Sequence, residues 1–200
     1  GSRLWDISMN PSTSPVASAE RDAILANPGF GGNFTDNMVR AKWTADKGWH
    51  DAELVAYGPL LLDPATNFIH YGQAIYEGAK AHHCADGALR LWNIESNARR
   101  MQQGCERMMM PEIPVDMFKG ACEWAVRANR AFVPPYGTAG SMYLRPYIFG
   151  HGPQLGLAPA PEFHFCVLAI PVASYYKSGL MPIDSLIMDG HDRAAPQGVG

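Results

Sequence analysis

Two long apolar runs late in the chain constrain its fold more than any other feature of the sequence. Residues 141–149 and 163–172 are each almost continuously apolar or aromatic, and each has the length of a strand. Runs of this kind are typical of strands that are buried within a sheet. The stretch between them, residues 150–161, is rich in glycine and proline and therefore predicts a boundary between two domains.

Short strands and one hairpin are predicted upstream of these runs. The apolar residues between Leu54 and Ile69 are broken by Gly-Pro and Asp-Pro pairs, a pattern that suits a meander of strands. Residues 79–84 and 88–92 flank an Ala-Asp-Gly sequence and predict a hairpin. Its turn contains Gly87, which can adopt positive φ without steric cost.

Two helices are predicted between the hairpin and the first long run. The first begins after Asn93, whose side-chain oxygen can cap it, and ends at Pro111. The second begins near Pro114 and ends before Pro134. Apolar residues at helical spacing predict one buried face on each helix. These residues are Ala98, Met101, Cys105, Met108 and Met109 in the first helix, and Val115, Phe118, Cys122, Ala125 and Val126 in the second.

This order of elements predicts an α/β (α+β) fold. Residues 1–30 show little periodicity and are expected to form a flexible N-terminal arm. We expect a small α/β domain over residues 31–150, an interdomain loop over residues 151–161, and the beginning of a larger domain over residues 162–200. Periodicity alone indicates no more than an enzyme-like α/β domain.

The charge and hydropathy of the chain exclude two classes of partner. The 200 residues carry a formal net charge of -3, and no basic run is interleaved with aromatic residues, so nucleic acid is not expected as a partner. No stretch is apolar for long enough to span a bilayer, so a membrane is not expected either. The chain begins with Gly1 and Ser2, which resemble the remnant of a cleaved tag, and it lacks the pattern of a signal peptide.

The cysteines and histidines show no spacing that is typical of a metal site. Cys84, Cys105, Cys122 and Cys166 are too far apart for a CxxC pair, and the seven histidines are scattered. Free thiols and surface imidazoles in a reducing cytoplasm are the simpler interpretation. We therefore expect a cytoplasmic protein without a bound metal.

Five short segments carry the functional signal, because each is weak alone but their common order is specific. They read HYGQAIYEGAKA at His70–Ala81, NARRM at Asn97–Met101, SMYLRP at Ser141–Pro146, GPQLGLAP at Gly152–Pro159 and PVASYY at Pro171–Tyr176. In this order they resemble the motifs of the fold-type IV aminotransferases. Among these enzymes, the resemblance is to the branched-chain amino acid aminotransferases.

The resemblance implies that pyridoxal 5'-phosphate is the cofactor and that an arginine of the small domain binds it. In this family the cofactor acts as an electron sink while a lysine holds it. Its phosphate is a dianion, which suits the planar fork of an arginine. By its place in the NARRM segment, Arg100 is similar to the phosphate-binding arginine of the family. The alternative is that Arg100 is a solvated helix residue like its neighbour Arg99.

The resemblance also implies that one pocket binds both aliphatic amino acids and glutamate. Aromatic rings can bury methyl groups, while hydroxyls and an arginine can bind a carboxylate. Tyr71, Tyr76, Tyr143 and Arg145 occupy the matching positions, and the last two alternate along one strand and so face the same side. The alternative for these residues is a core aromatic cluster with a structural ion pair. The family usually has phenylalanine where Tyr76 stands, which leaves the preference among leucine, isoleucine and valine open.

A homodimer is implied as well, because the members of this family are dimeric. Leu157 matches a loop position that reaches into the pocket of the partner subunit. Tyr175 matches a tyrosine of the large domain that lines the same pocket. Packing alone explains both residues equally well. The implied substrates are the amino acids leucine, isoleucine and valine, with 2-oxoglutarate as the 2-oxo acid.

The lysine that would hold the cofactor is expected a few residues beyond Gly200. Residues 193–200 are similar to the segment that precedes this lysine in the family. The lysines of the chain lie in other contexts and are interpreted as surface charges; they are Lys42, Lys47, Lys80, Lys119 and Lys177. We therefore expect that the 200 residues alone cannot catalyse transamination. The alternatives are a D-amino acid aminotransferase, an aminodeoxychorismate lyase, and a non-catalytic fragment that binds a partner chain.

Overall fold

The two apolar runs form the two longest strands of the protein. The structure is a computed structural model, and it describes residues 6–174 and 181–190. β7 (Ser141–His151) and β8 (Glu162–Val172) pair antiparallel along their whole length. The stretch 151–161, predicted as an interdomain loop, connects two neighbouring strands of one sheet. The division into a small domain over residues 31–150 and a larger domain from residue 162 stays a prediction.

Three strands extend the sheet on the side of β8. β2 (Asn37–Thr44) pairs antiparallel with β8, and β3 (Gly48–Ala56) pairs antiparallel with β2. β1 (Ser8–Asn10) then runs parallel to β3. Burial alternates from Val39 to Lys42 of β2, which agrees with a strand that has one face in the core.

Three short strands lie on the other side of β7. β5 (Ala79–His83) pairs with β7, and β6 (Leu89–Leu91) pairs with β5. The predicted hairpin is therefore confirmed, and Gly87 in its turn has a φ of 77°. β4 (Ala74–Tyr76) pairs with the other half of β7. The strand order is β1-β3-β2-β8-β7-β5-β6, which places β6 at one edge of the sheet.

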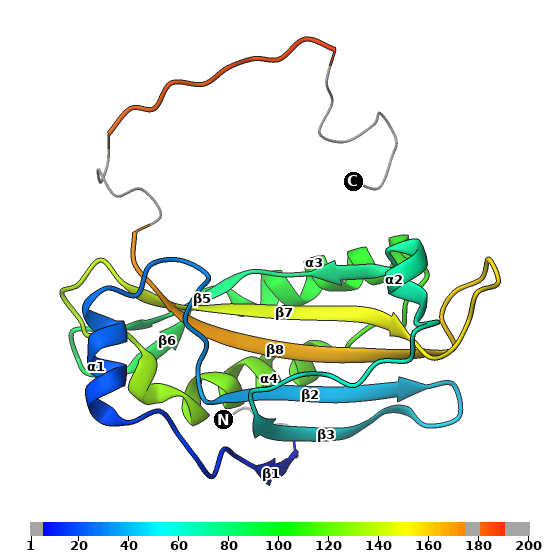
Figure 1. Ribbon diagram of the computed structural model, residues 1–200, viewed down its shortest axis with the longest axis horizontal. Helices are drawn as coiled ribbons and strands as arrows, with labels where there is room; N and C mark the ends of the chain where they lie inside the picture. The colour runs from blue at the N-terminus through cyan, green and yellow to red at the C-terminus, as the bar shows by residue number, and fades with distance from the viewer. Residues whose placement is uncertain (1–5, 175–180, 191–200) are drawn as a thin grey trace.

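Both predicted helices are confirmed, and they cover one face of the sheet (Figure 1). These are α3 (Ile94–Arg107) and α4 (Val115–Ala128). The predicted cap of α3 is wrong, because Asn93 adopts a left-handed conformation with a φ of 50° and its side chain makes no hydrogen bond to the helix backbone. Its Oδ1 atom accepts a hydrogen bond from the Ser96 hydroxyl at 2.9 Å instead. No helix among the described residues has the length and apolar character that crossing a bilayer requires.

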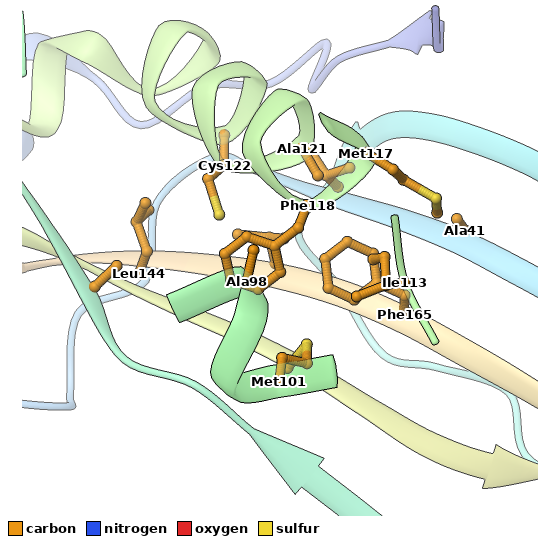
Figure 2. Close-up of a cluster of buried hydrophobic side chains, with 14 of the residues drawn as sticks. Ala41, Ala98, Met101, Ile113, Met117, Phe118, Ala121, Cys122, Leu144 and Phe165 are labelled. Carbon is orange, nitrogen blue, oxygen red and sulfur yellow. The ribbon is translucent and has the colours of Figure 1, made fainter. Parts of the chain in front are cut away.

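The core lies between these two helices and the central strands (Figure 2). Phe118 of α4 and Phe165 of β8 are fully buried, and their ring centroids lie 6.1 Å apart. Most of the predicted apolar positions are buried, namely Ala98, Met101, Cys105, Phe118, Cys122, Ala125 and Val126. Met109 is exposed instead, because α3 ends at Arg107 before the pattern does. The mixed α/β fold class is therefore confirmed.

Two stretches differ from what their sequence predicts. Residues 1–30 show little periodicity, yet they contain β1 and the helix α1 (Ser18–Ala26). The meander predicted between Leu54 and Ile69 is wrong, because the chain leaves the sheet after Ala56 and next forms the short helix α2 (Asn67–Tyr71). A turn at Asp63 replaces the strands: its carboxylate accepts a hydrogen bond from the Ala65 amide at 2.8 Å.

The core predicts a large cost for truncation at Phe118. We expect the Phe118→Ala variant to lose about 3–5 kcal/mol of unfolding free energy, because it leaves a cavity against Phe165. Urea unfolding followed by circular dichroism measures this loss. The control is Leu61→Ala, since the Leu61 side chain is 97% exposed and its truncation should leave the midpoint nearly unchanged. Equal midpoints for the two variants would contradict the described core.

Candidate active site

The predicted substrate-binding part of the candidate site lies on the face of β7 that points away from the helices. Met142 and Leu144 are fully buried in the core, so the alternate residues Tyr143 and Arg145 face the other side of the sheet. β4 lies beside β7, with Tyr76 opposite Tyr147 in the register of the two strands. The alternation of β7 therefore separates a packing face from a polar and aromatic face.

Arg145 lies between two tyrosine rings on this face. Its Nε and Nη2 atoms donate hydrogen bonds to the Tyr143 hydroxyl at 3.2 and 2.9 Å. Its Cζ atom lies 4.2 Å from the ring centroid of Tyr76 and 5.4 Å from that of Tyr143. A guanidinium over an aromatic face is held by electrostatic attraction while its remaining donors stay available. The three predicted substrate residues Tyr76, Tyr143 and Arg145 are thus brought together, and their role in substrate binding stays a prediction.

Gly78 sets the position of Tyr143. A Cβ atom at Gly78 would lie 2.7 Å from the Tyr143 hydroxyl oxygen, which is closer than real Cβ contacts. The ring of Phe30 lies on Tyr143 as well, with centroids 5.8 Å apart. Glycine at position 78 has no side chain, so the Tyr143 hydroxyl can lie next to the backbone there. In this position the hydroxyl also accepts hydrogen bonds from Arg145.

The Arg100 side chain is held by hydrogen bonds to a buried carboxylate. Its Nε and Nη2 atoms donate to the two carboxylate oxygens of Glu77 at 2.5 and 2.6 Å. Asn97 on the same helix donates to Glu77 Oε2 at 2.9 Å and to the Gly78 carbonyl at 3.1 Å. Arg99 instead pairs with Glu95 on the exposed side of α3. The two neighbouring arginines therefore have different surroundings, and Arg100 is not a solvated residue like Arg99.

Ionised Glu77 is favoured by this arrangement. Burial opposes its ionisation, but the hydrogen bonds from Arg100 and Asn97 and the charge of Arg100 outweigh burial, so the pKa of Glu77 lies below its ordinary value. The hydrogen bonds to Glu77 and the charge of this carboxylate raise the pKa of Arg100 above its ordinary value. Both partners are therefore charged at neutral pH.

The geometry of Arg100 fits a phosphate group. The Arg100 side chain is 67% exposed, whereas the side chain of Glu77 is only 4% exposed. Glu77 occupies one edge of the guanidinium, and Nη1 makes no hydrogen bond to any residue that the structure describes. An arginine held along one edge and open along the other can donate to a dianion without losing its orientation. The residues present therefore fit the phosphate end of pyridoxal 5'-phosphate.

Two other predicted residues lie in a different part of the structure. Tyr71 ends α2, and its hydroxyl donates to the carbonyl of Leu155 in the β7–β8 connection. Leu157 in the same connection is almost fully exposed. Gln73 holds this connection in place, since its side-chain oxygen accepts from the Ala160 amide at 2.9 Å. Tyr71 and Leu157 are thus both part of, or bonded to, the β7–β8 connection, whereas Tyr76 packs against Arg145. The predicted substrate residue Tyr175 lies outside the described residues.

Titratable side chains elsewhere in the described part of the chain do not form a metal site. No group of three or more His, Cys, Asp or Glu side chains that could hold a metal ion occurs within residues 6–174 and 181–190. Burial raises the pKa of the Cys105 thiol to about 12. Cys166 is also buried, which raises its pKa to about 12. These two thiols are therefore protonated at neutral pH and have no nucleophilic character.

Comparison with known proteins identifies the family. No family model matches the chain. A probable branched-chain-amino-acid aminotransferase of Streptomyces coelicolor is 45% identical over 194 residues, which is 97% of this chain and 54% of the relative. The chloroplastic branched-chain-amino-acid aminotransferase 2 of Arabidopsis thaliana is 44% identical over 174 residues, 87% of this chain and 45% of the relative.

The chain belongs to the branched-chain aminotransferase family. It spans about half the length of the curated relatives that it matches. Solved structures of branched-chain aminotransferases share its fold. The enzyme of Thermoproteus uzoniensis with norvaline aligns with a TM-score of 0.52 and 20% identity over 70% of this chain and 43% of that structure. The Escherichia coli enzyme aligns with a TM-score of 0.51 and 18% identity over 70% and 41% of the two chains.

Three residues of the site were missed by the sequence analysis. Glu77 and Gly78 follow Tyr76 directly in the HYGQAIYEGAKA segment, and Asn97 begins the NARRM segment. The sequence contains two signals for these roles. One is the acidic residue and the glycine that directly follow a predicted substrate tyrosine, and the other is the asparagine one helical turn before Arg100. Their roles depend on which side chains the fold brings together, and spacing alone does not show this.

The Glu77–Arg100 pair predicts a pH-dependent change in stability. We expect Glu77→Gln to lose about 1 kcal/mol of unfolding free energy at pH 7, a modest value because Arg100 is open to solvent. Because the pKa of Glu77 is lowered on folding, the loss should be complete above the ordinary glutamate pKa and should shrink as pH falls below about 4. Urea unfolding across this pH range tests the sign. Glu95→Gln, which removes the exposed pair with Arg99, is the matched control.

Gly78 predicts a specific coupling to the Tyr143 hydroxyl. Gly78→Ala should destabilise the protein by about 1–3 kcal/mol, because the new methyl group overlaps that hydroxyl. Tyr143→Phe removes the overlapping atom and should recover part of the loss in the double variant. A double-mutant cycle by urea unfolding measures the coupling. Strictly additive effects of the two substitutions would contradict the described contact.

Proposed function

We propose that this chain supplies part of the active site of a pyridoxal-phosphate-dependent aminotransferase that acts on leucine, isoleucine and valine with 2-oxoglutarate. The observation that carries the proposal is the placement of Arg145 between the rings of Tyr76 and Tyr143. The similarity to branched-chain aminotransferases over nearly the whole chain supports the same reaction class.

This cluster suits a pocket that must accept two kinds of side chain. The rings of Tyr76 and Tyr143 offer apolar surface to a branched aliphatic side chain. Arg145 offers charged donors to the side-chain carboxylate of glutamate or of 2-oxoglutarate. Because Tyr143 accepts from Arg145, the guanidinium is oriented before the substrate arrives, and little ordering entropy is lost on binding.

The cofactor would contribute the electron sink for proton removal from the substrate Cα atom. Arg100, held by Glu77, would bind its phosphate through the open edge of the guanidinium. The lysine that holds the cofactor would lie beyond Gly200. The chain alone would then bind and orient ligands without completing the reaction.

A homodimer is part of the proposal. Leu157 is exposed in the β7–β8 connection, and the Tyr71 hydroxyl bonds to Leu155 in the same connection. An exposed leucine on a loop that is anchored at its base suits insertion into a neighbouring subunit. The cytoplasmic location stays a prediction of the sequence.

Arg145 predicts an unequal loss for the two substrates. In the full-length protein that contains this sequence, Arg145→Met should lower kcat/KM for 2-oxoglutarate by about 100-fold, since a buried carboxylate loses its charged donor. The loss of kcat/KM for leucine should be several-fold smaller, because its aliphatic side chain needs no donor. Steady-state kinetics with each substrate varied in turn measures both values. Arg99→Met is the control, and equal losses for the two substrates would contradict the assigned role.

A further inference from the structure

A groove lies between the edge strand β6 and α4, in a part of the chain that the proposed active site does not use. Its volume is about 890 Å³, which is within the range of ligand-binding clefts. Leu89, Leu91 and Val126 contribute apolar surface to its lining. The two indole side chains of Trp92 and Trp124 also line it.

The sheet ends at this groove. β6 pairs with β5 on one side, and among the described residues it has no strand on its other side. Main-chain donors and acceptors along the outer edge of β6 are therefore not paired by the sheet. The groove is lined by β6 on one side and by α4 on the other, so an added strand would lie beside β6 and against this helix. An edge strand next to a helix is the arrangement that receives extended peptides by strand addition.

The charges that line the groove favour an acidic occupant. Arg127 and Arg130 are exposed, and neither side chain forms an ion pair with a described residue. Arg90 on β6 is already neutralised by Asp86, with hydrogen bonds of 2.6 and 2.8 Å. Glu123 also lines the groove, so the two guanidinium groups of Arg127 and Arg130 outnumber this one carboxylate. The resulting positive charge attracts carboxylates on a partner.

Trp92 gives the groove an aromatic anchor. It follows β6 directly and is 83% exposed, which is unusual for the largest side chain. Tryptophan and arginine are the residues that most often dominate binding energy at protein interfaces. Trp92 therefore offers a contact surface for apolar side chains at one end of the groove.

We propose that this groove binds an extended, acidic segment of a partner protein. The segment adds to β6 as a further strand, and its apolar side chains contact Trp92 and Val126. Its carboxylates lie at Arg127 and Arg130. This inference is independent of the proposed aminotransferase activity, because none of these residues belongs to the candidate active site.

The test uses the full-length protein and a short capped probe peptide, Glu-Glu-Val-Thr-Val-Thr-Val-Glu-Glu. Isothermal titration and tryptophan fluorescence should both detect saturable binding that weakens with added salt. The Arg127→Glu/Arg130→Glu variant should bind this probe at least about tenfold more weakly. The same variant should gain affinity for the counterpart peptide that has lysine in place of glutamate. Lys119→Glu on α4, outside the groove, is the matched control and should bind like the unmodified protein.

Strand addition is tested separately from charge. A probe in which prolines replace the two threonines loses the main-chain N–H groups at both positions and is disfavoured as a paired strand, so it should bind much more weakly. Circular dichroism of each variant before titration verifies that it is folded. The proposal is overturned if the full-length protein binds neither probe, if both charge types bind equally, or if the proline probe binds as well as the parent. It is also overturned if Arg127→Glu/Arg130→Glu abolishes self-association, because the groove would then be covered by a second copy of the chain.

Discussion

The strict alternation of side chains along β7 is the constraint on which the rest of the structure depends. Met142, Leu144 and Ile148 enter the core beneath α3 and α4, while Tyr143 and Arg145 take the opposite face. A slip of one residue in the pairing with β8 would move charged and aromatic groups into the core and would remove the candidate site. Pairing along the full length of β7 and β8 makes such a slip costly, so the packing of the core and the geometry of the site are determined together.

Glu77 and Gly78 connect the two halves of the candidate site. Glu77 holds the arginine that suits a phosphate, and its amide donates to the Pro146 carbonyl of β7 at 2.8 Å. Gly78 makes room for the Tyr143 hydroxyl, which in turn orients Arg145. The cofactor-facing and substrate-facing residues therefore share one segment of backbone. We expect a disturbance at either residue to reach both halves.

Much of this architecture follows from the sequence, and the exceptions have physical reasons. The two long strands, the hairpin and both helices have strong local patterns, and Tyr143 and Arg145 are placed on one face by the two-residue period of a strand. The stretch 151–161, predicted as an interdomain loop, joins two paired strands, because glycine and proline mark a hairpin connection as well as a linker. The strand β1 depends on pairing between residues distant in sequence, such as Ser8 and Glu53. The hydrogen bonds that hold Arg100 likewise come from Glu77, which is distant in sequence. Such contacts leave no local pattern.

Whether this chain works within a pyridoxal-phosphate enzyme is tested most directly by trapping the cofactor. The full-length protein would be incubated with pyridoxal 5'-phosphate, reduced with borohydride and digested, and the modified peptide would be located by mass spectrometry. We predict a single modified lysine beyond Gly200, and a much lower yield of modified peptide when Arg100 is replaced by glutamine. The prediction is contradicted if the yield does not depend on Arg100. It is also contradicted if the modified lysine is one within the chain, namely Lys42, Lys47, Lys80, Lys119 or Lys177.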